Sequence, residues 1–303
     1  MRFAISIPQD VTDREFDPAA FRAHLRRAEE LGFEGAWTQE QVLGSASRLS
    51  PIETMSYAAA CTERLRLGCA VLVTPLHIPV HLAKSLSTLD QLSRGRLDVG
   101  VGTGGQGRMF SAFGLDPDGL VSRFTEGLNL MKACWTQSRI DFDGRFWQVE
   151  GAAMEPKPFQ KPHPPIWFGA HAPAALRRAV RHGDAFIGAG SATTEQFADE
   201  VGILREALVE EGRDAAGFPI AKRVYIAVDG DAARTGERVA AGLRNLYGHD
   251  GLTDVAVWGP PEACVEGLQK VADAGAELIL LTPLYDDAEQ MERLAADVMP
   301  HLG

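Results

Sequence analysis

Glycines gather in one loop of this sequence, residues 102–107, which reads GTGGQG. Leu97, Val99 and Val101 alternate with small or polar residues just before it, which predicts a strand that runs into the loop. So few side chains let backbone N–H groups approach a ligand closely, and an anionic ligand gains most from such contacts. The loop fits the pattern G-x-G-x-x-G in two registers, although ordinary turns also match that pattern. On its own, the loop predicts either an anion site or a tight turn.

Side chains that could bind or transfer protons follow two other predicted strands. Glu40 and Gln41 follow the stretch 35–38, and His77 lies in the loop 74–79. A carboxylate or an imidazole can act as a general acid or base, whereas the Gln41 amide can only donate and accept hydrogen bonds. A carboxylate at a strand end also often caps a neighbouring helix, so both roles stay open for Glu40.

A metal site is not expected from the histidines. His77 and His81 have H-x-x-x-H spacing, but Ile78 and Pro79 interrupt the helix between them and no third ligand is evident. We therefore expect no metal, and interpret His77 as a residue that faces the substrate.

The elements that must position these residues alternate between strand and helix. The predicted strands are 3–7, 35–38, 65–73, 97–101, 166–168, 185–187, 224–228 and 278–281. Amphipathic helices are predicted in the intervals, and one interval, at about 136–164, departs from this order. Asp143-Gly144 within it predicts a hairpin turn, so we interpret it as an insertion.

The order of the elements separates two fold classes. A dinucleotide-binding sheet would place its glycine loop after the first strand, whereas here three strand–helix units precede the loop 102–107. The sequence therefore predicts an α/β fold, a single (β/α)8 TIM barrel over residues 1–303. In such a barrel the loops that follow the strands share one rim, where enzymes keep their active sites.

Composition excludes several classes of function. The formal net charge of −11 argues against binding to nucleic acid or to an anionic membrane surface. Four cysteines form no C-x-x-C pair, and Cys61 and Cys69 are expected to be buried free thiols. We find neither a signal peptide nor a membrane span, so the expected location is cytoplasmic.

Several segments together resemble the luciferase-like monooxygenase superfamily, which includes F420-dependent reductases and dehydrogenases. The segments are GCAVLVTPLHIPVHLAKSLSTLDQ, LSRGRLDVGVGTG, DFDGRFWQV, PPIWFGAHAPAALRRA and GDAFIGAG. The resemblance implies a barrel, usually a homodimer, that binds FMN or the deazaflavin coenzyme F420 at the carboxyl ends of its strands. It also implies redox chemistry on the cofactor ring, with a small-molecule substrate.

The same resemblance implies positions for the cofactor. A non-prolyl cis peptide that backs the ring would lie at Ala70–Val71. The residues implied beside the ring, the ribityl chain and the phosphate are Thr103, Gly104, Gly105, Gly169, Ala170, His171, Ala189, Gly190 and Ser191. His171 is either a neighbour of the phosphate or an exposed loop residue.

Two positions depart from the family pattern. Many deazaflavin dehydrogenases have a Glu where this chain has Gly105, and alcohol-oxidising members have a His where it has Gln41. These departures favour a reductase or an oxygen-using monooxygenase, with Glu40, Gln41 and His77 near the substrate.

The sequence leaves the cofactor and two other functions open. Arginine far outnumbers lysine, a bias of GC-rich genomes in which deazaflavin users are frequent, so F420 is preferred and FMN is the alternative. A non-catalytic partner subunit of the same fold is a second interpretation. A barrel hydrolase or lyase is less favoured, because the lysines fall mostly in helices or in the insertion.

Overall fold

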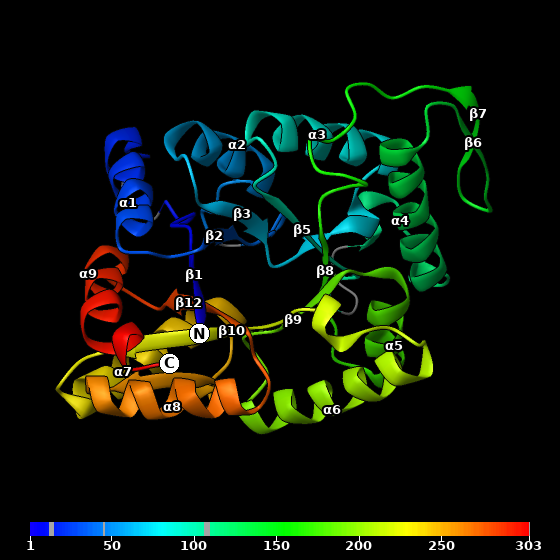
Figure 1. Cartoon of the computed structure of the whole chain (residues 1–303). Helices are drawn as coiled ribbons and strands as arrows, with labels where there is room; N and C mark the ends of the chain where they lie inside the picture. The colour runs from blue at the N-terminus through cyan, green and yellow to red at the C-terminus, as the bar shows by residue number, and fades with distance from the viewer. Residues whose placement is uncertain (12–14, 45, 106–109, 303) are drawn as a thin grey trace. The chain divides into compact units, whose positions relative to one another are not determined.

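The computed structural model describes residues 1–11, 15–44, 46–105 and 110–302, and Figure 1 shows the alternation of strands and helices along the chain. The strands are β1 (Arg2–Ser6), β2 (Gly35–Thr38), β3 (Arg66–Cys69), β4 (Leu72–Val73), β5 (Leu97–Gly102), β6 (Ile140–Asp143), β7 (Gln148–Ala152), β8 (Ile166–Phe168), β9 (Ala185–Gly188), β10 (Ile220–Val228), β11 (Ala256–Gly259) and β12 (Leu278–Pro283). The α-helices are α1 (Pro18–Glu30), α2 (Pro51–Cys61), α3 (Pro79–Leu92), α4 (Leu120–Thr136), α5 (Pro173–His182), α6 (Thr194–Glu210), α7 (Ala232–Tyr247), α8 (Pro261–Asp273) and α9 (Asp287–Arg293).

Strand pairing confirms the predicted fold class. The order of the main sheet is β11-β10-β12-β1-β2-β3-β5-β8-β9, and β10 also pairs with β9. The strand pairs described in this sheet are parallel, with Ile5 opposite Leu281 and Ser6 opposite Trp37 as examples. The last strand, β12, pairs with β1, and the pairing of β10 with β9 closes the sheet. Parallel strands that are linked by helices and closed in this way form a (β/α)8 barrel. The chain divides into two compact units, which we describe in turn.

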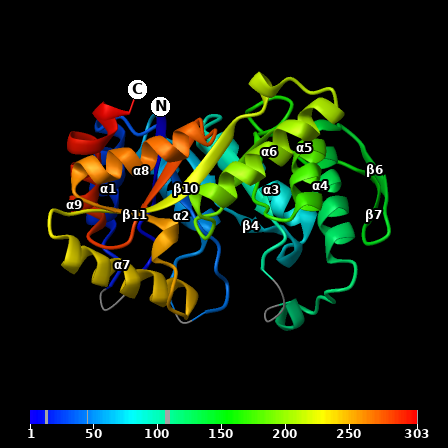
Figure 2. The same cartoon turned by 90° about the horizontal axis from the view of Figure 1, so that it is seen from below.

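The first unit comprises residues 1–8, 17–37 and 168–303. Its longest strand, β10, is buried along all nine residues, and α7 and α8 pack against β10 and β11 (Figure 2). Helix α6 begins with a capping box, in which the Thr193 hydroxyl and the Gln196 side chain each bind the other's backbone N–H. Asp17 caps the start of α1, because its carboxylate accepts hydrogen bonds from the backbone N–H groups of Ala19 and Ala20.

The second unit comprises residues 9–16 and 38–167, and α3 packs between α2 and α4 within it (Figure 1). The predicted hairpin is confirmed, because β6 and β7 pair antiparallel and Gly144 N–H donates to the Trp147 carbonyl at 2.9 Å. The Glu126 carboxylate on α4 accepts the backbone N–H groups of residues 145–147 and so attaches the hairpin to the helix.

Three details of the predicted elements were wrong. The stretch 65–73 is not one strand, since β3 ends at Cys69 and β4 begins at Leu72. The seventh barrel strand starts at Ile220 and not at Val224. An additional strand, β11, pairs with the end of β10, where Val228 lies opposite Gly259.

All four cysteines are free and buried, which confirms the expectation for Cys61 and Cys69. In the described part of the chain, no helix is long and apolar enough to span a membrane.

Candidate functional site

The interruption of the third barrel strand is a cis peptide bond. Ala70–Val71 is a non-prolyl cis peptide, as the resemblance implied. The two residues are partly exposed, whereas Cys69 before them and Leu72 after them are buried. The strand is therefore accessible at this point.

Neighbouring strands hold both sides of this interruption. The Ala70 N–H donates to the Thr38 carbonyl at 2.8 Å, and the Thr38 hydroxyl donates to the Gly68 carbonyl at 3.1 Å. On the opposite side, a Cβ atom at Gly100 would lie only 1.7 Å from the Cys69 carbonyl oxygen. Only glycine allows β5 to pass this close to the backbone of β3.

A carboxylate–imidazole pair lies next to the same interruption. Glu40, two residues after the end of β2, accepts the Val73 backbone N–H through Oε2 at 2.6 Å. Its Oε1 lies 2.8 Å from Nε2 of His77. The Glu40 side chain is 3% exposed and that of His77 is 27% exposed, so the imidazole lies between the buried carboxylate and solvent. In a neutral imidazole this contact favours the tautomer with the hydrogen on Nε2, which would leave Nδ1 as an acceptor.

Gln41 is next to this pair in sequence but contributes differently. Its side chain folds back over its own loop, where a Cβ atom at Gly44 would lie 2.1 Å from Nε2 of Gln41. His81 lies in α3 and is exposed. The described residues contain no group of three His, Cys, Asp or Glu side chains arranged to hold a metal ion.

The glycine loop after β5 is described as far as Gly105, and Gly107 of the sequence pattern lies outside the described residues. Gly104 has φ +76°, and a Cβ atom there would lie 2.7 Å from Cγ1 of Val73. Gly105 is exposed with no atom within 4 Å of a Cβ position. Thr103 and Gly104 therefore lie beside the strand that carries the cis peptide, in the same unit as Glu40 and His77.

The other predicted residues belong to the first unit. Gly169, Ala170 and His171 follow β8, and His171 Nδ1 lies 2.8 Å from Oε1 of Glu200 on α6. His171 is exposed while Glu200 is 6% exposed. The loop therefore carries an imidazole that is tied to a buried carboxylate, a partner that the sequence did not indicate.

The loop after β9 is fixed by β10. The buried ammonium group of Lys222 donates to the carbonyls of Ala189 and Ala192, the second at 2.8 Å. On the other side, a Cβ atom at Gly190 would lie 2.7 Å from the Tyr225 ring. Burial lowers the pKa of Lys222 to about 8, and the charge of Glu200 opposes this shift.

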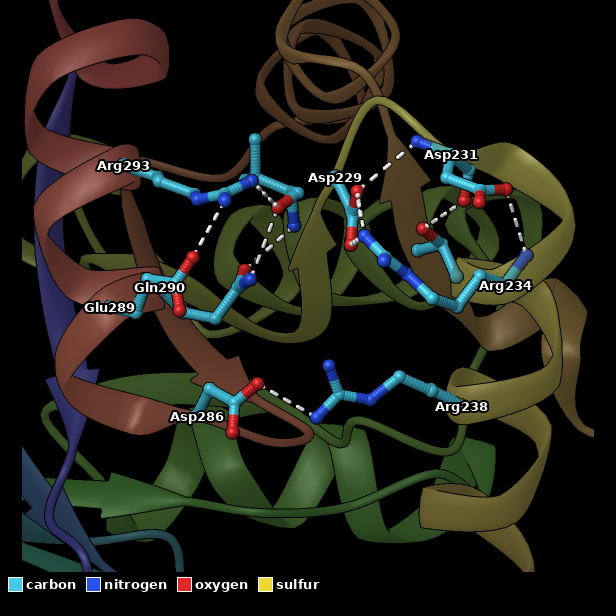
Figure 3. A network of polar contacts seen from close by, with 10 residues as sticks. Asp229, Asp231, Arg234, Arg238, Asp286, Glu289, Gln290 and Arg293 are labelled. Atoms are coloured by element: carbon cyan, nitrogen blue, oxygen red, sulfur yellow. Dashed lines mark hydrogen bonds and ion pairs between the residues drawn. The ribbon is translucent and has the colours of Figure 1, made fainter.

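A separate polar network binds the end of β10 to α7 and α9 (Figure 3). Arg234 holds both oxygens of Asp229 at 2.9 and 2.7 Å, and Gln290 and Arg293 donate to the Val228 carbonyl. The Asp231 backbone N–H and the Arg234 guanidinium hold the pKa of the Asp229 carboxyl below its usual range. These groups pair with one another, so the network joins the end of β10 to α7 and α9.

Comparisons of the sequence and of the fold with known proteins give relatives of the same kind. The sequence profile of the luciferase-like monooxygenases matches residues 1–253. The chain is 27% identical to the F420-dependent glucose-6-phosphate dehydrogenase of Beutenbergia cavernae over 95% of this chain and 94% of that enzyme. It is 35% identical to the FMNH2-dependent dimethylsulfone monooxygenase of Pseudomonas putida over 54% of this chain and 47% of that enzyme. The monooxygenase RslO1 from Streptomyces bottropensis has a TM-score of 0.86 and 26% identity, with 100% of both chains covered.

These alignments differ in extent. The chain spans about half the length of several curated relatives that it matches, and nearly all of the glucose-6-phosphate dehydrogenase.

Proposed function

Because the chain belongs to the luciferase-like monooxygenase family, we propose that it is an oxidoreductase that acts on a small organic substrate with coenzyme F420, FMN being the alternative cofactor. The observation that carries this proposal is the Glu40–His77 pair beside the cis peptide Ala70–Val71. It combines an accessible stretch of a barrel strand with a group that can exchange a proton.

The described residues fit a flat, polar redox ring. Ala70 and Val71 are partly exposed, and Gly105 in the loop after β5 has open space around its Cβ position. The Thr74 hydroxyl is buried without a hydrogen-bond partner among the described residues, so it is available to a ligand. When bound, the cofactor would supply a ring carbon or nitrogen that exchanges a hydride, or that reacts with oxygen in the FMN case.

The residues of the chain then handle the proton. Glu40 is held by the Val73 N–H, and it fixes the orientation and tautomer of the His77 ring. Nδ1 of His77 takes a proton from a substrate hydroxyl, or the protonated ring returns one to a reduced substrate. Gln41 contributes hydrogen bonds only.

An alcohol dehydrogenase is a second candidate, and the structure favours it more than the sequence did. This chain has Gln41 at the position where alcohol-oxidising relatives have a histidine. His77 brings an imidazole to the adjacent carboxylate from a different loop. The loss at position 41 therefore does not leave the region without a proton acceptor.

The proposed activity is tested with a panel of small secondary alcohols, ketones and α,β-unsaturated carbonyl compounds. Each is incubated with F420 or its reduced form, and separately with reduced FMN and oxygen, while cofactor absorbance is recorded. We expect substrate-dependent turnover with F420. A protein that binds cofactor, turns over no member of the panel and co-purifies with a second homologous chain would support the partner-subunit interpretation instead.

We further propose a homodimer, a cytoplasmic location and a single domain with an insertion at about 136–164. The assembly follows from the resemblance, and light scattering on purified protein tests it. A monomer at micromolar concentration would contradict it.

A further inference from the structure

The most unusual buried charge in the first unit belongs to Arg223 on β10. The residue is 9% exposed, its Nε donates to the Thr282 hydroxyl at 3.2 Å, and its guanidinium lies 4.7 Å from the centre of the Tyr225 ring. Its Nη2 atom is buried and has no hydrogen-bond partner among the described residues. No carboxylate in the described ranges forms an ion pair with it. Buried charges in proteins are normally paired, so this guanidinium lacks a counterion.

The neighbouring residue, Lys222, is a buried cation whose ammonium group has hydrogen-bond acceptors, as expected for a structural role. Successive residues of a strand point to opposite faces, so Lys222 and Arg223 face different sides of β10. Lys222 donates to two loop carbonyls and lies 5.7 Å from the Phe197 ring centre. Arg223 has one neutral hydroxyl and one aromatic ring, and neither neutralises its charge.

Further hydroxyl groups lie at the far end of the Tyr225 ring that this guanidinium contacts. Tyr225 OH and Tyr247 OH lie 2.7 Å apart, and Ser191 follows Gly190 in the loop after β9. Gly190 lets the loop approach the Tyr225 ring, because any Cβ atom there would clash with it. Ser191, Tyr225, Tyr247 and Thr282 therefore bring hydroxyl donors to the same part of the first unit as the unpaired cation.

We propose that Arg223, with the hydroxyls of Thr282 and Ser191, binds an oxyanion of a ligand: a carboxylate, phosphate or sulfonate group. A guanidinium presents its donors in a planar fork that matches such groups, and hydroxyls can complete the shell. The oxyanion comes either from the phosphate of the cofactor or from an acidic group on the substrate. The first source rests on the proposed function, whereas binding of a simple anion does not.

The first test uses inorganic phosphate and sulfate as probes on the whole protein. Thermal melts are recorded at increasing anion concentration, with chloride at equal ionic strength as reference, for wild type, Arg223→Met and Arg223→Gln. Arg177→Met, which removes a surface arginine of α5 paired with glutamates, is the matched control. Phosphate should stabilise the wild type and the control, and the apparent affinity should fall about tenfold or more in both Arg223 variants.

Stability without anion separates a binding role from a structural one. If Arg223 serves to bind a ligand, Arg223→Met removes an unpaired buried charge from the ligand-free protein. The melting temperature of this variant in anion-free buffer should then equal or exceed that of wild type. Two results overturn the proposal. One is that both Arg223 variants are less stable than wild type in that buffer or fail to fold, which assigns Arg223 to the core. The other is that phosphate stabilises them as well as it stabilises wild type.

The source of the anion is decided by ligand pairs that differ only in phosphate. Binding of FMN is compared with riboflavin, and of F420 with its phosphate-free deazaflavin core, by fluorescence titration. If the cofactor phosphate is the anion, wild type prefers the phosphorylated member and Arg223→Met loses that preference. If the preference is unchanged while inorganic phosphate binding is lost, the anion belongs to the substrate.

Discussion

His77 and Glu40 are the residues on which the proposed chemistry depends, and they differ in what they contribute. Glu40 is almost fully buried and held by a backbone N–H, while His77 reaches solvent. The Glu40 carboxylate therefore orients the His77 ring, and the imidazole exchanges the proton with the substrate.

Replacing His77 by Asn is predicted to lower kcat by roughly 10²–10⁴-fold, because the substrate proton loses its acceptor. Cofactor affinity should change little. His81→Asn, which removes an exposed histidine from α3, is the matched control and should keep wild-type kcat. Steady-state kinetics on the best substrate of the panel measure both. Equal kcat in wild type and His77→Asn would remove His77 from the mechanism.

Lys222 predicts a pH dependence of stability. Burial lowers its pKa to about 8, so between pH 8 and 10.5 the unfolded chain binds a proton that the folded chain does not. The contribution of Lys222 to the free energy of unfolding therefore rises across this window, by a total on the order of 3 kcal/mol.

Urea unfolding at a series of pH values from 8 to 10.5 checks this prediction. The difference between wild type and Lys222→Met should grow in favour of wild type as pH rises. Lys270→Met, which removes an exposed lysine paired with Glu266, should not abolish the rise. A difference that is constant over the window would mean that Lys222 titrates normally in the folded protein.

Residue types could be predicted more easily than their partners. The sequence identified Glu40 as a candidate acid or base and His77 as a residue that faces the substrate, but their contact joins positions 37 residues apart. Arg223 was missed, although its signal is visible: with Lys222 it interrupts the otherwise apolar run IAKRVYIAV. Charged residues are rarely buried unless they are paired, so two consecutive cations in a buried strand indicate that each needs a partner.

At the scale of the elements, the site depends on how closely β5 approaches β3. Gly100→Ala is predicted to destabilise the fold by about 2 kcal/mol or more and to weaken cofactor binding, because its Cβ atom would displace the Cys69 carbonyl. Gly202→Ala in α6 is the control, since no atom lies within 4 Å of its Cβ position. This control should gain up to about 1 kcal/mol from helix propensity. Denaturant unfolding and cofactor titration of both variants test this prediction. A Gly100→Ala variant as stable as wild type would contradict the close approach of β5 to β3.

Elements were predictable where hydrophobic periodicity was strong. Most barrel strands and the hairpin at Asp143-Gly144 appear at the expected places, apart from the break in 65–73 and the earlier start of β10. Strand β11 was missed because AVWG is short and its pairing is with the distant end of β10. The break at Ala70–Val71 has no signal in periodicity, since the whole stretch 65–73 is apolar; only the family resemblance indicated it.

At the scale of the whole molecule, the order of strands and helices decided the fold class. Three strand–helix units before the glycine loop excluded a dinucleotide-binding sheet, and the observed strand order agrees with that exclusion. Substrate choice was beyond prediction because loops after the strands set it, and loops vary independently of the core that determines the fold.

The proposed function depends most directly on whether the protein binds a redox cofactor of the flavin type. Purified protein freed of ligand is titrated with F420 and, separately, with FMN, and the cofactor fluorescence is followed to saturation. We expect saturable binding of F420 at one site per chain, and weaker binding of FMN. Tighter binding of FMN would assign the chain to the flavin-dependent members of the family, and binding of neither cofactor would contradict the proposed function.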